Sequence, residues 1–188
     1  EDPLGAVTLT EYDEYNEVVK EIDPLGNTLS FSYDGRGNAT TVTWPDGATV
    51  TMTYGGLGAP DADQPVEEID EQGGLWKWRY DAQGRLVERI DPLGGTTRLV
   101  YQGTRLSTVV NERGHATGLR FDGGGLLIGL FSPDGGTSSW EYDRLGRPVA
   151  ETDPNGNVQG LVYDLLGRVT AAREPDGNLR ELTYDAED

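Results

Sequence analysis

The fold is decided by the stretch Leu75-Trp-Lys-Trp-Arg-Tyr80-Asp-Ala-Gln-Gly84-Arg-Leu-Val-Glu-Arg-Ile90-Asp-Pro-Leu-Gly94, which reads as strand, turn, strand, turn. Its three aromatic residues alternate with other residue types, and a period of two places them on one face of a β-strand. Asp81 to Gly84 then supply an Asp that caps a turn and a Gly suited to positive φ. A second strand runs to Ile90, and Asp-Pro-Leu-Gly closes the unit with a second turn.

This unit recurs along the whole chain, with a usual spacing of 21 residues, as between Tyr12 and Tyr33. A period of that length with two turns leaves room for two strands of ordinary length. Fixed self-similarity predicts a repeat array, here an all-β array of about nine antiparallel β-hairpins. The aromatic residue that ends the first strand of each repeat is Tyr12, Tyr33, Tyr54, Tyr80, Tyr101, Phe121, Tyr142, Tyr163 and Tyr184.

A second apolar position lies two residues before this aromatic residue, on the same strand face. The position between them is mostly polar, so we expect one apolar face, turned away from bulk water, and one wet face. The apolar position holds Phe31, Met52, Trp78, Leu99, Leu119, Trp140, Leu161 and Leu182, and Thr10 is the exception.

One insertion interrupts the period, because the spacing from Tyr54 to Tyr80 is 26 residues instead of 21. We expect a long loop over 55–65. A loop of this length is either a binding feature or a tolerated surface insertion, and we favour the insertion. The predicted organisation is therefore a single array over residues 1–188 with an inserted loop, cut from a much longer chain.

The composition excludes some partners, since 33 Asp and Glu residues outnumber 15 Lys and Arg residues and give a net charge of −18. Nucleic-acid binders need clustered positive charge, so no nucleic-acid partner is expected. We interpret the acidity as an aid to solubility and as protection of open sheet edges. No apolar run is long enough to cross a bilayer, so this segment is not expected to insert into a membrane. The chain has no cysteine, which excludes disulfides and thiolate chemistry.

The repeated motif resembles the YD repeat of Rhs proteins. It is clearest in Tyr80-Asp-Ala-Gln-Gly-Arg-Leu86, Tyr142-Asp-Arg-Leu-Gly-Arg147 and Tyr163-Asp-Leu-Leu-Gly-Arg-Val169, and the resemblance covers essentially the whole chain. It implies a long sheet of hairpins that curves and spirals into a hollow shell, which in bacterial members encloses a variable C-terminal toxin. Related proteins include Rhs effectors of interbacterial competition, the C components of Tc insecticidal toxins, and teneurins. Gly55 and Gln102 depart from the motif by replacing its Asp.

The resemblance also implies where such a segment acts. Its partners would be the rest of its own chain, an enclosed toxin domain, and a secretion-system spike or another delivery component. The protein would be made in the bacterial cytoplasm and secreted or delivered as part of a larger toxin. No self-cleaving, aspartyl-protease-like region of the kind found in toxin-releasing relatives follows Asp185.

Catalytic and metal sites are not expected. A carboxylate pair could act as acid and base, but an enzyme needs one such site, whereas the candidate carboxylates recur with the period. The chain has one histidine, His115, without a partner histidine or cysteine, and Asp61-Ala-Asp63 lacks the ligand series of a calcium loop. We therefore expect no enzymatic activity, no cofactor and no metal. The recurring carboxylates are Asp13, Asp34, Asp81, Asp122, Asp143, Asp164 and Asp185.

An alternative function is a carbohydrate-binding or cell-surface adhesion module, in which Trp76, Trp78 and Trp140 face a sugar or a passenger. Exposure discriminates between the two functions. Sugar-binding aromatic residues stand in an open groove, whereas the aromatic residues of a wall are packed between neighbouring hairpins. Nearly every repeat carries the same apolar pair, so we favour the structural wall.

Overall fold

The computed structural model describes residues 7–184, and every regular element within them is a β-strand. The chain divides into two compact units, Glu1–Arg98 and Leu99–Asp188. The first unit contains β1 (Leu9–Tyr12), β2 (Val18–Ile22), β3 (Thr28–Tyr33), β4 (Ala39–Thr43), β5 (Thr49–Tyr54), β6 (Pro65–Ile69), β7 (Leu75–Tyr80), β8 (Leu86–Ile90) and the start of β9 (Thr96–Gln102). The second contains the end of β9 and β10 (Arg105–Val110), β11 (Ala116–Phe121), β12 (Leu127–Phe131), β13 (Thr137–Tyr142), β14 (Pro148–Thr152), β15 (Val158–Tyr163), β16 (Val169–Arg173) and β17 (Leu179–Glu181).

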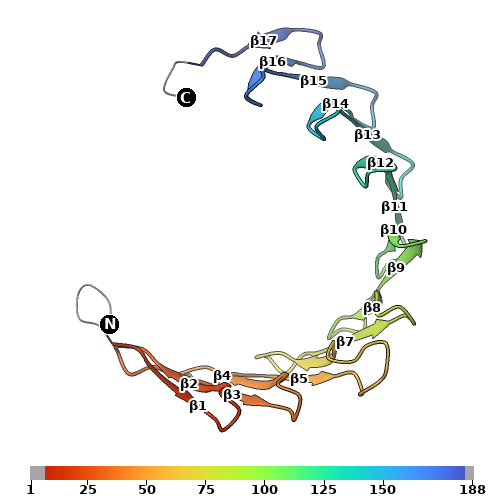
Figure 1. Cartoon of the computed structure of the whole chain (residues 1–188). Helices are drawn as coiled ribbons and strands as arrows, with labels where there is room; N and C mark the ends of the chain where they lie inside the picture. The colour runs from red at the N-terminus through yellow and green to blue at the C-terminus, as the bar shows by residue number, and fades with distance from the viewer. Residues whose placement is uncertain (1–6, 185–188) are drawn as a thin grey trace. The chain divides into compact units, whose positions relative to one another are not determined.

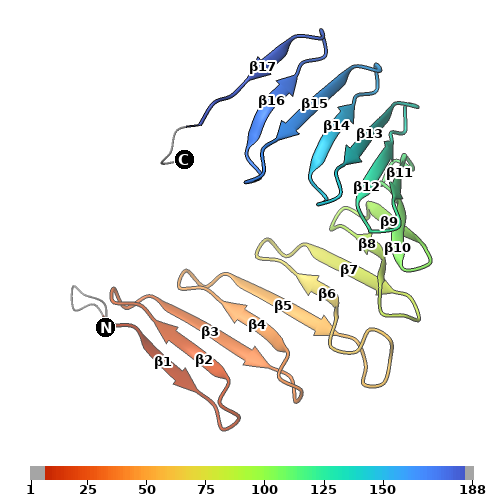
Figure 2. The ribbon, with the colours of Figure 1, turned by 45° about the horizontal axis from the view of Figure 1, so that its top comes forward.

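The strands pair in chain order within one 17-stranded sheet, and the pairings are antiparallel (for example β3 with β4 and β13 with β14). Figure 1 labels the strands, and Figure 2 shows neighbouring hairpins of each unit lying side by side. The predicted all-β hairpin array is confirmed, including hairpins at Tyr12, Tyr33, Tyr80, Phe121, Tyr142 and Tyr163. The single array over 1–188 and the closure of the sheet into a spiral shell stay predictions. The described part of the chain contains no helix that could span a membrane.

Each hairpin turn is built by the residues that the motif places there. The Gly84 N–H donates to the Asp81 carbonyl at 2.9 Å, and the Asp81 N–H donates to the Arg85 carbonyl at 2.9 Å. The Asp81 carboxylate accepts the backbone N–H groups of Gln83 and Arg85 at 2.9 and 3.0 Å. Gly84 has a φ of 74°, the left-handed residue that follows a tight turn in this kind of hairpin. The second turn repeats the pattern at Asp91, whose carboxylate accepts two backbone N–H groups at 2.9 and 2.8 Å.

A β-bulge follows most of the first turns. In the β7–β8 pair, Arg79 opposes Glu88 while Tyr80 opposes Leu86, so Val87 is skipped. A bulge of this kind interrupts the ladder locally and increases the twist of the hairpin. Every skipped residue within the described pairings is β-branched, namely Val19, Thr40, Val66, Val87, Ile128, Val149 and Thr170.

The two faces of the sheet differ in exposure as the alternation predicts, but neither face is fully buried. No described hydrophobic residue is buried, because a single sheet layer has no second layer to cover it. The expectation of an apolar face turned away from water is therefore corrected to a half-buried face. Its eight members are all half-buried, and the residues next to them are all exposed, namely Ser32, Thr53, Arg79, Val100, Arg120, Glu141, Val162 and Thr183.

The inserted segment over 55–65 is a compact loop that reaches the hairpins on both sides. On one side, the Arg36 guanidinium donates to the Gly55 carbonyl at 2.9 Å and pairs with Asp63 at 3.0 Å. On the other, the Gln64 amide donates to the Gly84 carbonyl at 2.9 Å. The loop thus links the turns of β3–β4 and β7–β8 to its own hairpin. We call it the clamp loop, and its tolerance as a surface insertion stays a prediction.

Candidate functional site

The repeated tyrosines bind neighbouring hairpins through their hydroxyl groups. Tyr80, for example, donates its hydroxyl to the Pro65 carbonyl at 2.8 Å, and Pro65 lies one residue before the skipped Val66 of the preceding hairpin. The bond therefore satisfies a carbonyl where the bulge disturbs the ladder. The equivalent bond to a residue fifteen positions earlier, at 2.7 or 2.8 Å, is made by tyrosines that include Tyr33, Tyr54, Tyr80, Tyr142, Tyr163 and Tyr184.

An arginine and an aspartate complete the link between hairpins. Arg147 pairs with Asp143 of its own turn at 2.6 Å and lies over the Tyr163 ring of the next hairpin, 4.5 Å from its centre. Arg168 pairs with Asp164 at 2.8 Å and lies 4.6 Å from the centre of the Tyr184 ring. The carboxylate holds the planar guanidinium in place, and the aromatic face attracts its charge. Each such turn is therefore fastened to the following repeat.

The three candidate tryptophans differ in what covers them. Trp76 donates its indole N–H to Asp70 at 3.0 Å, and Arg89 lies over its ring at 5.3 Å. Trp78 is half-buried among the apolar residues of its face. Trp140 lines a groove of about 310 Å³, and Trp78 lines one of about 570 Å³ beside the clamp loop. Trp76 is thus held by contacts within the protein, whereas Trp140 lies beside open space.

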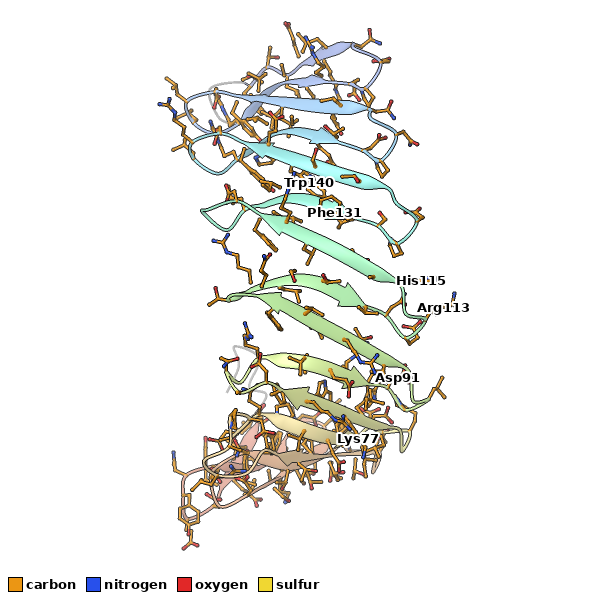
Figure 3. All side chains as sticks on the ribbon, turned by 90° about the vertical axis from the view of Figure 1, so that its right-hand side faces the viewer. Lys77, Asp91, Arg113, His115, Phe131 and Trp140 are labelled. Carbon is orange, nitrogen blue, oxygen red and sulfur yellow. The ribbon has the colours of Figure 1, made fainter. Side chains whose placement is uncertain are left out.

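The other candidate residues have structural contacts. His115 is exposed in the turn after β10, where its backbone N–H donates to Asn111 at 3.0 Å, and Figure 3 shows it at the edge of the ribbon. Asp63 accepts the Asn38 amide at 3.0 Å and has a φ of 62°. Among residues 7–184, no three His, Cys, Asp or Glu side chains gather as a metal site would require.

The periodic contacts agree with a family assignment. The RHS Repeat family model matches residues 12–49, 61–97 and 121–158, which together exceed half of the chain. The chain belongs to the RHS repeat family. No curated protein sequence matches it.

Solved structures share the RHS repeat fold. The crystal structures of TcdB2-TccC3-TEV and of TcdB2-TccC3 each match with a TM-score of 0.74 at 17% identity, over 97% of this chain and 11% of theirs. TcdB2-TccC3 without its hypervariable C-terminal region matches with a TM-score of 0.62 at 13% identity, over 89% of this chain and 12% of that chain. This chain thus spans about a tenth of the length of these structures, and the likeness shows the fold.

Each recurring residue type of the repeated motif Tyr-Asp-x-x-Gly-Arg has a physical role in the structure. Tyr supplies a ring and a hydroxyl, Asp caps its own turn, Gly provides the left-handed residue, and Arg joins Asp to the next Tyr ring. Sequence reasoning predicted the Asp and Gly roles, because they are local. It assigned Tyr to an apolar face and missed its hydroxyl bond, whose partner lies in another hairpin. The residue fifteen positions before each of these tyrosines is followed by a β-branched residue. This regularity in the sequence could have indicated the bond.

Tyr142→Phe is expected to lower the free energy of unfolding by about 1 kcal/mol, since it leaves the Leu127 carbonyl without its donor. Urea denaturation followed by tryptophan fluorescence measures the change. Tyr12→Phe is the matched control, because the Tyr12 hydroxyl has no hydrogen-bond partner in the part of the chain that the structure describes. The control should change stability by less than about 0.3 kcal/mol. Equal losses in the two variants would contradict a structural role for the tyrosine hydroxyl bonds between hairpins.

The Asp34 carboxylate remains charged in unusually acidic solution. Hydrogen bonds from the Asn38 amide, from backbone N–H groups and from Arg36 lower the pKa of Asp34 to about 2. The amide of Asn157 similarly lowers the pKa of Asp153. An unfolded Asp has a pKa of about 3.9, so the stabilisation by Asp34 is complete above that pH and is lost as the pH falls towards about 2.

We expect the melting temperature of the chain to decrease between about pH 4 and pH 2, and the decrease to be smaller in Asp34→Asn, which has no carboxylate to protonate. Thermal melts followed by circular dichroism at a series of pH values measure both quantities. Identical pH profiles for the two proteins would show that Asp34 does not contribute to the acid transition.

Proposed function

We propose that this chain is a structural segment of the repeat shell of an RHS-type toxin protein, and that the complete shell encloses a C-terminal passenger. The observation that carries the proposal is the repeated link between hairpins. Tyrosine hydroxyls, turn aspartates and arginines, which are the chemically capable groups, form the same structural contacts in successive repeats. A wall requires such periodic contacts, whereas a catalytic site requires one arrangement that differs from the rest.

Two further observations support a larger assembly. The solved structures of the same fold are about nine times longer than this chain, since it covers 11% of theirs, and one of them is described as being without its hypervariable C-terminal region. The passenger of this protein would likewise lie C-terminal to its repeats. Its partners would be the rest of its own chain, the enclosed toxin domain and a delivery component, and it would be made in the bacterial cytoplasm and then secreted.

We propose in addition that the segment is not an enzyme. Asp143 and Asp164 each pair with an arginine and accept the backbone N–H groups of their own turn, so they are not available as general bases. Expressed alone in bacteria, the chain should leave growth unchanged, and the purified chain should hydrolyse neither glycans nor nucleic acids. Growth arrest that disappears when one aspartate is replaced would overturn this part of the proposal.

Encapsulation is tested in the full-length protein that contains the segment. Trypsin treatment of the folded protein should leave the passenger intact, whereas the same passenger produced alone should be degraded. Rapid loss of the passenger from the folded parent would show that the repeats form a scaffold that does not enclose it. The adhesion alternative is supported by the grooves beside Trp78 and Trp140 but not by Trp76, because the ring and the N–H of Trp76 already have partners within the protein.

A further inference from the structure

The groove beside Trp140 lies on the aromatic face of the second unit, across β13, β14 and β15. It has a volume of about 310 Å³, and its walls include Trp140 and Tyr142 from β13, Glu151 from β14, and Gln159 and Leu161 from β15. Figure 3 labels Trp140 on β13. Glu151 is the cross-strand partner of Trp140 and Gln159 is the partner of Glu151, so the three side chains form one row on one face.

This row breaks the pattern of the other tryptophan repeat. Trp140 corresponds to Trp78 by its place before the repeated tyrosine, and Glu151 then corresponds to Arg89, the cross-strand partner of Trp78. Arg89 is used within the protein, because it lies over the Trp76 ring at 5.3 Å. Glu151, in contrast, is exposed and forms no ion pair with any residue between 7 and 184. The Glu151 carboxylate is therefore available to pair with a cation that comes from outside these residues.

Elsewhere in the chain, an arginine lies between an aromatic ring and a carboxylate. Arg147 contacts Asp143 at 2.6 Å and the Tyr163 ring at 4.5 Å, and Arg168 makes the same two contacts in the next repeat. Both arginines are supplied by the chain itself. In the groove, Trp140 and Glu151 provide the ring and the carboxylate, but no described arginine occupies the space between them.

We propose that the groove binds an arginine side chain presented by a basic polypeptide segment of another protein. The guanidinium would pair with Glu151 and stack on the Trp140 ring, and its methylene stem would lie along Leu161. Charge complementarity favours this occupant, because the chain has a net charge of −18 and attracts cationic partners. The inference goes beyond the wall function and holds whether or not the repeats enclose a passenger.

The test uses the whole chain, labelled with ¹⁵N, and a pentapeptide with one arginine between glycines, acetylated and amidated. Its counterpart with citrulline keeps the shape of the side chain and removes the charge. The arginine peptide should shift the Trp140 indole N–H signal, assigned with Trp140→Phe, and bind at least about tenfold more tightly than the citrulline peptide. Glu151→Gln should weaken its binding by about tenfold.

Glu141→Gln is the matched control, because Glu141 is exposed and follows Trp140 on β13, so it points to the opposite face of the sheet. It removes the same charge from the chain and should leave binding unchanged. Equal binding of the two peptides, or equal loss in the two Glu variants, would overturn the proposal. So would a shift of the Trp140 signal by a linear glucan oligosaccharide without any shift by the arginine peptide, which would assign the groove to a sugar.

Discussion

Replacing Gly55 with alanine is expected to lower the free energy of unfolding by about 2 to 3 kcal/mol. Gly55 is buried where the clamp loop meets β5, and a methyl group on it would lie 2.1 Å from the Asp61 carbonyl oxygen. That distance is far below van der Waals contact and the obstacle is backbone, so the loop must move. Its movement would strain the bond from Arg36 to the Gly55 carbonyl.

The neighbouring Gly56 provides the control, because a methyl group there would meet nothing within 4 Å. Gly56→Ala should change stability by less than about 0.5 kcal/mol. Urea denaturation measures both variants, and limited proteolysis should cut the clamp loop faster in Gly55→Ala than in the unchanged protein. Equal stability of the two alanine variants would mean that the clamp loop does not hold the turns together.

Trp78→Ala is expected to cost about 2 kcal/mol of unfolding free energy. A fully buried tryptophan costs about 3 to 5 kcal/mol when it is truncated, and Trp78 is only half-buried on its face. The loss follows from removal of a large apolar side chain from the half-buried face of its hairpin.

Arg79→Ala is the control on the opposite face of the same strand, where the Arg79 side chain is 68% exposed and pairs with Glu88 at 3.1 Å. An exposed ion pair contributes less than about 1 kcal/mol. Chemical denaturation compares the two variants. A loss below about 0.5 kcal/mol in Trp78→Ala would show that the aromatic face is not a packing surface.

The local features of the hairpins could be predicted from the sequence. The period of two in Leu75–Tyr80 predicts a strand, and Asp81 and Gly84 predict the turn after it, because these residues determine conformation within a few positions. The contacts between hairpins could not be predicted in the same way. A hydroxyl bond from Tyr80 to Pro65 depends on how one hairpin lies against the previous one.

The contacts of the clamp loop could not be predicted for the same reason. Nothing in its glycine-rich sequence indicates that Asp63 pairs with Arg36 of one neighbouring turn or that Gln64 reaches Gly84 of the other. The degree of burial was overestimated because alternation shows which residues share a face but not whether a second layer covers it. The groove beside Trp140 also required the structure, since the sequence shows that Trp140 shares a face with Tyr142 but not what covers its ring.

The tyrosine hydroxyl bonds between hairpins give the array a direction of assembly. In each of these bonds the donor belongs to the later hairpin and the acceptor carbonyl to the earlier one, as with Tyr163 and Pro148. During synthesis from the N-terminus, every new hairpin therefore brings the group that attaches it to a hairpin already made. Its stabilising contacts span only a short stretch of chain, which favours rapid folding. The repeats can thus fold one after another as they leave the ribosome, without waiting for the rest of the chain.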